Sequence, residues 1–106
     1  MLGVVEMLPA KIMDLVNKLT EMTKKGNLKW EYDYYNDKVT AHLDYFTISM
    51  MYVFDSDTGI AYIHVDYLDN SNGQWYRFTT DSNYYDFSAA KLLYDEAQAS
   101  QFDVKF

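Results

Sequence analysis

The chain has 106 residues, no cysteine and a formal net charge of −7. Its length corresponds to a single domain, residues 1–106, and 49% hydrophobic with 18% aromatic residues is enough for one core. The missing cysteines exclude disulfides, thiolate metal sites and cysteine nucleophiles. The acidic balance disfavours direct binding to nucleic acid or to an anionic membrane.

Residues 1–10 have neither the basic start nor the apolar run of a signal peptide, which favours a soluble protein in the cytoplasm. A helix is the first element predicted, and Pro9 suits its first turn. Its apolar stripe, at helical spacing, consists of Ile12, Leu15, Val16, Leu19 and Met22. Lys24 and Lys25 suit its last turn, and Gly26 suits a left-handed stop.

The apolar period then changes to two, which predicts an antiparallel meander of about five strands. The predicted strands cover residues 28–34, 39–43, 46–54, 60–68 and 74–79. The predicted turns lie at Asn36-Asp37, Asp44-Tyr45, 55–59 and 69–73. At Asp44-Tyr45 the alternation shifts by one residue, and we prefer a tight hairpin to a bulge there, although hairpins of this length favour Asn-Gly or Asp-Gly.

A second helix is predicted after the meander. Asp81 and Ser82 are its candidate N-caps, and Asp86 near its start suits the helix dipole. Its apolar stripe consists of Phe87, Ala90, Leu93, Tyr94 and Ala97. Residues 102–106 alternate as in a short edge strand. The order of helix, five-strand meander and helix defines an α+β fold.

The two longest predicted strands, 46–54 and 60–68, carry large side chains on both faces. A sheet with two apolar faces must be covered on both. Either the two helices split between the faces, or a second subunit covers one face. We therefore expect a homodimer.

Metal and cofactor motifs are missing from the sequence. His42 and His64 lie in the middle of strands, without a metal-ligand spacing. Asp55 and Asp57 resemble the opening of a calcium loop, but the following glycine comes one residue early and the twelfth position, Asp66, lies in a strand. A hairpin turn explains the same residues. We expect no metal site and no cofactor.

Catalytic motifs are missing as well. No serine lies in a Gly-x-Ser-x-Gly or Ser-x-x-Lys pattern, and the four glycines are isolated, so no phosphate-binding loop is predicted. We expect no catalytic residue and no enzymatic activity.

Eleven tyrosines are the most unusual feature of the composition. Tyrosine combines an apolar ring with a polar tip, so the tyrosines suit either a sheet face covered by helices or an exposed binding surface. Residues 39–106 also hold ten acids against three bases. The candidate interaction residues are Tyr32, Tyr34, Tyr52, Tyr62, Tyr67, Asp55, Asp57, Asp66 and Asp69.

These features favour a small non-catalytic binding protein that acts through an acidic, tyrosine-rich protein–protein surface. A specific version is an inhibitor or nucleic-acid mimic whose carboxylates occupy the groove of a basic, nucleic-acid-binding partner. The meander predicts two acidic groups, with Asp55, Asp57 and Asp81 at one end and Asp69 at the other. The alternative function is a small-ligand sensor with an aromatic pocket between sheet and helix.

Three segments carry a resemblance to known proteins. They are Leu-Thr-Glu-Met-Thr-Lys-Lys-Gly-Asn-Leu-Lys at 19–29 followed by Trp30, Tyr62–Phe78 with its central turn, and Leu92-Leu93-Tyr94 with Ala97. Together they resemble small uncharacterised bacterial and phage proteins of the order helix, meander, helix. The resemblance implies a fold and a prokaryotic or phage setting, and no activity or functional residue.

Overall fold

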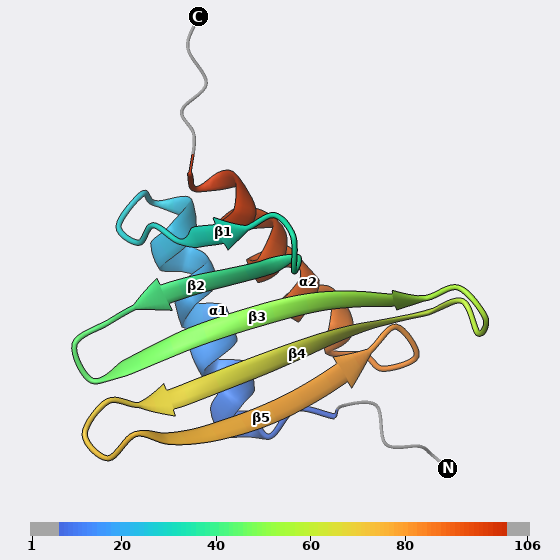
Figure 1. The fold of residues 1–106 in the computed structure, drawn as a ribbon, viewed down its shortest axis with the longest axis horizontal. Coiled ribbons are helices and arrows are strands. Elements are labelled where there is room, and N and C mark those ends of the chain that lie inside the picture. Colours follow the sequence, from blue (N-terminus) through green and yellow to red (C-terminus); the bar gives the residue numbers. More distant parts are fainter. Residues whose placement is uncertain (1–6, 102–106) are drawn as a thin grey trace, which may run out of the picture.

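The computed structural model describes residues 7–101, and its element order confirms the predicted α+β fold. Helix α1 spans Ala10–Lys24, and helix α2 spans Phe87–Ala99. The strands β1 to β5 span Glu31–Asp33, Lys38–His42, Phe46–Asp55, Ile60–Asp69 and Gln74–Asp81. They form an antiparallel sheet in chain order (Figure 1). Residues 102–106, with their predicted edge strand, lie outside the described residues.

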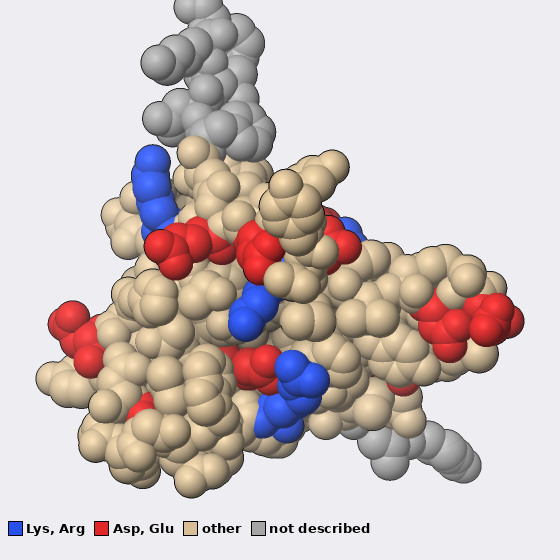
Figure 2. Space-filling view, in the orientation of Figure 1, with Lys and Arg blue, Asp and Glu red and all other residues tan. Residues whose placement is uncertain are grey.

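Both helices lie on the same face of the sheet, behind it in Figure 1, and they pack against each other. The strand residues that enter the apolar core share one side-chain direction: Val39, Ala41, Ile48, Met50, Ile63 and Val65. The helices therefore do not split between the two faces. We call the face without a helix the open face, and Figure 2 shows it.

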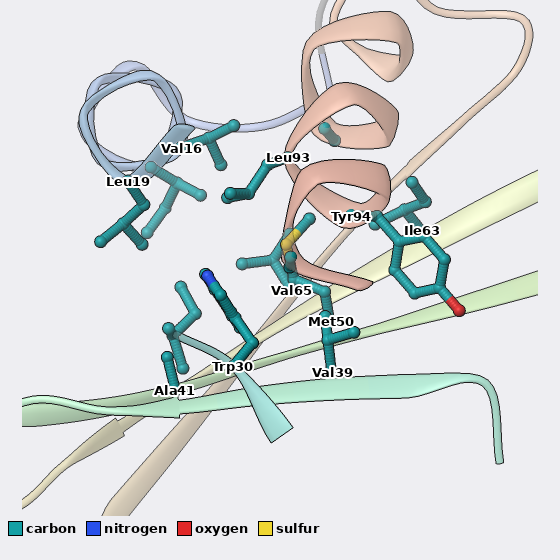
Figure 3. Close-up of a cluster of buried hydrophobic side chains, with 14 of the residues drawn as sticks. Val16, Leu19, Trp30, Val39, Ala41, Met50, Ile63, Val65, Leu93 and Tyr94 are labelled. Atoms are coloured by element: carbon teal, nitrogen blue, oxygen red, sulfur yellow. The ribbon is translucent and has the colours of Figure 1, made fainter. Parts of the chain in front are cut away.

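The core fills the space between the helices and the sheet. Figure 3 shows Val16 and Leu19 of α1 and Leu93 of α2 above the strand residues, with the ring of Trp30 among them. The Trp30 side chain is buried, and its Nε1–H donates a hydrogen bond to Thr23 Oγ1 at 3.0 Å. Burying an apolar side chain of this size stabilises the fold by about 1.5–3 kcal/mol. Neither described helix is long and apolar enough to cross a membrane.

The first strand is shorter than the predicted range of 28–34. The backbone of Trp30 bonds to the end of α2, because its N–H donates to Ser100 Oγ and its carbonyl accepts from Gln101 Nε2, both at 3.0 Å. At the other end, Asp33 Oδ1 accepts from the backbone N–H of Tyr35 at 3.1 Å, which starts a turn. Tyr34 therefore lies in that turn and not on the strand.

The predicted hairpin at Asp44-Tyr45 is confirmed. Leu43 N–H donates to Phe46 O at 2.9 Å, which closes a tight turn with Asp44 and Tyr45 at its tip. Neither connecting residue has a positive φ, so the turn does not need Asn-Gly. The adjacent β4–β5 turn supports it instead, since Asn70 donates from its backbone to Tyr45 O and from Nδ2 to Leu43 O.

The second helix starts later than predicted. Asp81 is the last residue of β5, and Ser82 Oγ accepts from Ala61 N–H at 3.1 Å, so neither residue caps the helix. Asp86 immediately precedes α2, but its carboxylate makes no capping bond. It is buried and accepts hydrogen bonds from the backbone of Met7 and Leu8 and from Thr80 Oγ1.

Candidate functional site

The open face carries large apolar side chains along β3, β4 and β5. The register pairs Val53 with Tyr62 and Leu68 with Trp75, so apolar contacts lie toward both ends of the strands. Trp75 is 50% exposed and Val53 is 40% exposed. We define the open-face apolar group as Met51, Val53, Ile60, Tyr62, Leu68 and Trp75. Large contiguous apolar patches on a protein surface are typical of interaction sites, so this group is a candidate contact surface.

The polar side chains at the centre of the open face are paired with one another. Arg77 donates from Nε and Nη2 to the two carboxylate oxygens of Asp66, at 2.7 and 2.8 Å. Two more pairs cross neighbouring strands, Thr40 with Ser49 at 2.9 Å and His64 with Thr79 at 2.8 Å. These cross-strand bonds satisfy part of the hydrogen-bonding capacity of the central polar groups before any other surface covers them.

The surroundings of Arg77 and His64 at this centre favour a protonated Arg77 and a neutral His64. The hydrogen-bonded Asp66 carboxylate raises the pKa of Arg77. Burial lowers the pKa of His64, and the nearby positive charge of Arg77 lowers it further. His64 is therefore neutral at pH 7, and a neutral imidazole costs less to desolvate than an imidazolium.

The carboxylates at the two ends of the sheet lie in separate groups, and Asp69 has the helix-facing parity because it pairs with Phe46. Asp55, Asp57 and Asp81 lie at the end that holds the β3–β4 turn, and Asp69 lies at the opposite end, as the sequence predicts. Figure 2 shows acidic atoms at the tip of the β3–β4 hairpin and near β1, with basic atoms toward the middle. Hydrogen bonds from Ser71 lower the pKa of Asp69 and keep it ionised.

The candidate tyrosines do not share one surface. Tyr62 lies on the open face, and Tyr34 is 75% exposed in the β1–β2 turn. Tyr32, Tyr52 and Tyr67 have the helix-facing parity. Tyr32 and Tyr52 pack against the core, and Tyr67 stacks on Phe46. The interpretation in which the helices cover a tyrosine-bearing sheet face therefore applies to these last three residues. Of the five candidate tyrosines, only Tyr62 belongs to the open-face apolar group.

Tyr32 and Tyr52 belong to a cluster around the β1–β2 turn. Tyr94 O–H donates to Asp37 O at 2.8 Å, and Tyr32 O–H donates to Asp37 Oδ1 at 3.2 Å. Tyr52 packs on Tyr94 with 5.9 Å between ring centroids, and Lys91 Nζ lies 5.4 Å from the Tyr52 ring centroid. Burial raises the pKa of Tyr94. These contacts hold Asp37 at a positive φ of 51° and give the two tyrosines a structural role.

The resemblance to a calcium loop does not extend to the geometry. Asp55 Oδ1 accepts from Asp57 N–H and Asp55 O accepts from Gly59 N–H, which forms a closed turn with Gly59 at φ 73°. Asp66 lies six residues beyond Ile60 along β4, roughly 20 Å away at ~3.3 Å per residue, and bonds to Arg77. Residues 7–101 contain no group of three or more His, Cys, Asp or Glu that could hold a metal ion.

Tyr67 lines a second feature, a groove between α1 and the helix-facing side of the sheet. The Tyr67 ring stacks on Phe46 at 5.0 Å between centroids and lies 6.5 Å from Tyr76. Together with Phe78 these rings form one wall, and Ile12 and Leu15 of α1 form the other. The groove has a volume of about 560 Å³. We call it the aromatic groove.

Several residues of these two surfaces were not among the candidates from sequence. On the open face they include Trp75 and Met51, and in the groove Phe46, Tyr76 and Phe78. The alternation in Gln74–Asp81 is the sequence signal that separates these residues into two faces, since Trp75 and Arg77 have one parity and Tyr76 and Phe78 have the other. Which parity faces the helices depends on the register with β4, which the strand itself does not encode.

Comparisons of the chain with protein-family models, with curated proteins and with solved structures found no match.

Proposed function

We propose that this chain is a small, non-catalytic, cytoplasmic protein that binds another protein through the open face. The observation that carries the proposal is that both helices cover one face of the sheet. The open-face apolar group is thereby left without a covering layer. Surfaces with exposed apolar and aromatic side chains and a polar rim are typical of protein–protein interfaces.

Two properties of the open face support burial by a partner. Trp75 is half exposed, so covering it removes on the order of 100 Å² of mostly apolar surface, worth about 2–3 kcal/mol. The central polar groups keep their existing hydrogen bonds, as in the pair of Asp66 with Arg77. A flat partner surface can therefore lie over the centre while Trp75 supplies much of the affinity.

The charge at the margins selects the kind of partner. The chain carries a net charge of −7, and the rim of the open face is acidic at Glu31, Asp33, Asp55 and Asp81. A partner whose flat apolar patch is edged by Lys and Arg complements this arrangement and is attracted from a distance. Because the acids form separate groups, they support steering of a basic protein better than imitation of a continuous phosphate backbone.

The test is affinity capture with the intact chain as bait, comparing wild type with two single variants. Trp75→Ser changes the open face. Leu92→Ser is the matched control, because Leu92 is similarly exposed at 42% but lies on α2. We expect a protein that wild type and Leu92→Ser retain, that Trp75→Ser loses, and that elutes when salt is raised. Retention unaffected by Trp75→Ser contradicts the proposal.

Charge steering has its own variant. Replacing Asp55 and Asp57 by Asn keeps oxygen acceptors in the turn and removes two charges, so folding should be unaffected and association should slow. Replacing Asp95 and Glu96 on α2 by Asn and Gln removes the same charge elsewhere. If both pairs of substitutions slow association equally, the effect is due to net charge and not to the rim of the open face.

A second copy of the chain is the competing occupant of the open face. Burying two open faces together would also bring two chains of charge −7 into contact, which opposes self-association. Light scattering distinguishes the two cases. A monomer mass near 12.5 kDa at high micromolar concentration leaves the face to another protein. If the chain is a dimer and Trp75→Ser converts it to a monomer, the open face is instead the interface of the homodimer expected from the sequence.

A further inference from the structure

The aromatic groove lies on the other side of the sheet from the open face, between α1 and the ends of β3, β4 and β5. Phe46 begins β3, Tyr67 lies near the end of β4, and Tyr76 lies near the start of β5, so the register brings all three rings together. Helix α1 packs mainly on α2, and the twisted sheet leaves a hollow beneath the outer part of α1.

The groove has two apolar walls and a charged rim. One wall is made of aromatic rings from the sheet, and the other of the aliphatic side chains of Ile12 and Leu15. The rim carries Lys11, Asp14 and Lys18 from α1. Among residues 7–101 none of these three side chains forms an ion pair, so both ammonium groups are available. The rim thus has a net positive charge on a chain of −7.

The volume of about 560 Å³ falls in the range of about 300–1,000 Å³ that is typical of small-molecule sites. A planar ring system fits such a hollow, because offset stacking on Phe46, Tyr67 or Tyr76 adds to the gain from apolar burial. The phenol hydroxyls of Tyr67 and Tyr76 make no hydrogen bond within the described residues and can donate to a polar substituent.

We propose that the aromatic groove binds a small aromatic carboxylate, with its ring system between the sheet and α1 and its carboxylate at Lys11 and Lys18. The carboxylate is selected over a cation by the two lysines, which outnumber Asp14. The aromatic body is selected over an acyl chain by the ring wall. This site is separate from the open face, so its test does not depend on the protein–protein proposal.

The test is an NMR titration of the ¹⁵N-labelled full chain with 2-naphthoate. We expect shift changes to gather on residues of the groove, such as Leu15, Tyr67 and Phe78, while Val53 on the open face reports no change. Two ligands with the same ring, 2-naphthylmethanol and 2-naphthylmethylamine, test the role of the charge. We expect the alcohol to bind about fivefold more weakly than the carboxylate, as two exposed charge pairs imply, and the amine more weakly still.

Variants locate the two parts of the site. Replacing Lys11 and Lys18 by Gln should weaken naphthoate binding about fivefold and leave binding of the alcohol unchanged. Replacing Lys24 and Lys25 by Gln, at the far end of the same helix, removes equal charge and should have little effect. Tyr76→Ser should weaken both ligands, whereas Tyr85→Ser, at a residue 75% exposed in the loop before α2, should weaken neither.

Four outcomes would overturn the inference. They are shift changes spread over the open face, an amine that binds as tightly as the carboxylate, decanoate that binds more tightly than naphthoate, and no binding of naphthoate at millimolar concentration. If naphthoate does not bind, the expected occupant of the groove becomes an apolar side chain of a protein partner.

Discussion

The buried carboxylate of Asp86 offers the sharpest test of how this fold is held together. It is 1% exposed and joins three elements, because it accepts hydrogen bonds from Met7 N–H at 2.9 Å, Leu8 N–H at 2.7 Å and Thr80 Oγ1 at 2.5 Å. The chain before α1 is thereby fixed to the end of β5 and the start of α2. Asp86→Ala removes the acceptor and leaves these donors facing an apolar side chain.

The expected cost follows from the number and surroundings of the lost bonds. A hydrogen bond to a charged group contributes about 1.5–3 kcal/mol, and a buried donor left unsatisfied costs about 1–3 kcal/mol. Met7 is 41% exposed, so water can satisfy its N–H and reduces the loss. We expect Asp86→Ala to lower the free energy of unfolding by about 3–4 kcal/mol. Asp86→Asn should cost only about 1 kcal/mol, because the amide oxygen still accepts from Leu8 and Nδ2 can donate to Thr80 Oγ1.

Urea unfolding followed by tryptophan fluorescence measures these differences, because unfolding exposes the buried Trp30. With a slope near ~1.5 kcal/mol per M, the midpoint should fall by about 2 M for Asp86→Ala and by less than about 1 M for Asp86→Asn. Asp81→Ala is the control, since that carboxylate makes only the exposed turn bond to Asn83 N–H. A midpoint for Asp86→Ala equal to that of Asp81→Ala would refute the reasoning.

Three further predictions use the same urea and thermal measurements. Burial lowers the pKa of His64 below the unfolded value of 6.5, so protonation favours unfolding and stability should fall as pH drops below 6.5; His64→Asn should reduce this slope between pH 7 and pH 5. Thr23→Val leaves the Trp30 Nε1–H without its acceptor and should cost about 1–2 kcal/mol, and an unchanged midpoint would show that the indole finds another partner. EDTA should leave the thermal midpoint unchanged, and a loss of several degrees restored by calcium would contradict the expected absence of a metal site.

The elements that sequence predicts well are those whose signals are local. Gly26, Gly59 and Gly73 each have a φ between 73° and 77° and mark the end of α1 and two hairpin turns. The hydrophobic periods predict α1 and four of the five strands nearly to their ends, and they predict α2 with a start that is too early. These features depend on residues within a few positions of each other, so a single sequence contains enough information.

The predictions fail where a backbone or side-chain group forms its hydrogen bonds with a segment far away in the sequence. The predicted strand at 28–34 is interrupted because Ser100 and Gln101 bond to the backbone of Trp30. Asp86 is a residue type that caps helices and lies where a cap would, yet its carboxylate bonds to Met7 and Leu8, which lie 79 and 78 residues away, respectively. No local pattern distinguishes these uses.

The candidate surface was predicted less well than the fold for the same reason. Five tyrosines were candidates for one surface, but the strand parities place Tyr62 on the open face and Tyr52 and Tyr67 under the helices. Assigning a strand parity to a face requires the location of both helices. The sequence offered two arrangements, and the structure is needed to choose between them.

The packing of α2 also has a consequence for the order in which the chain can fold during synthesis. Helix α2 contacts α1 and every strand, yet it is made after all of them. At about 5–20 residues per second, roughly 0.6–3 seconds pass between the synthesis of the end of β5 and that of Leu93 and Tyr94, which complete the core. During that interval both faces of the sheet expose apolar side chains, so a pause in translation before α2 would favour aggregation of the nascent chain.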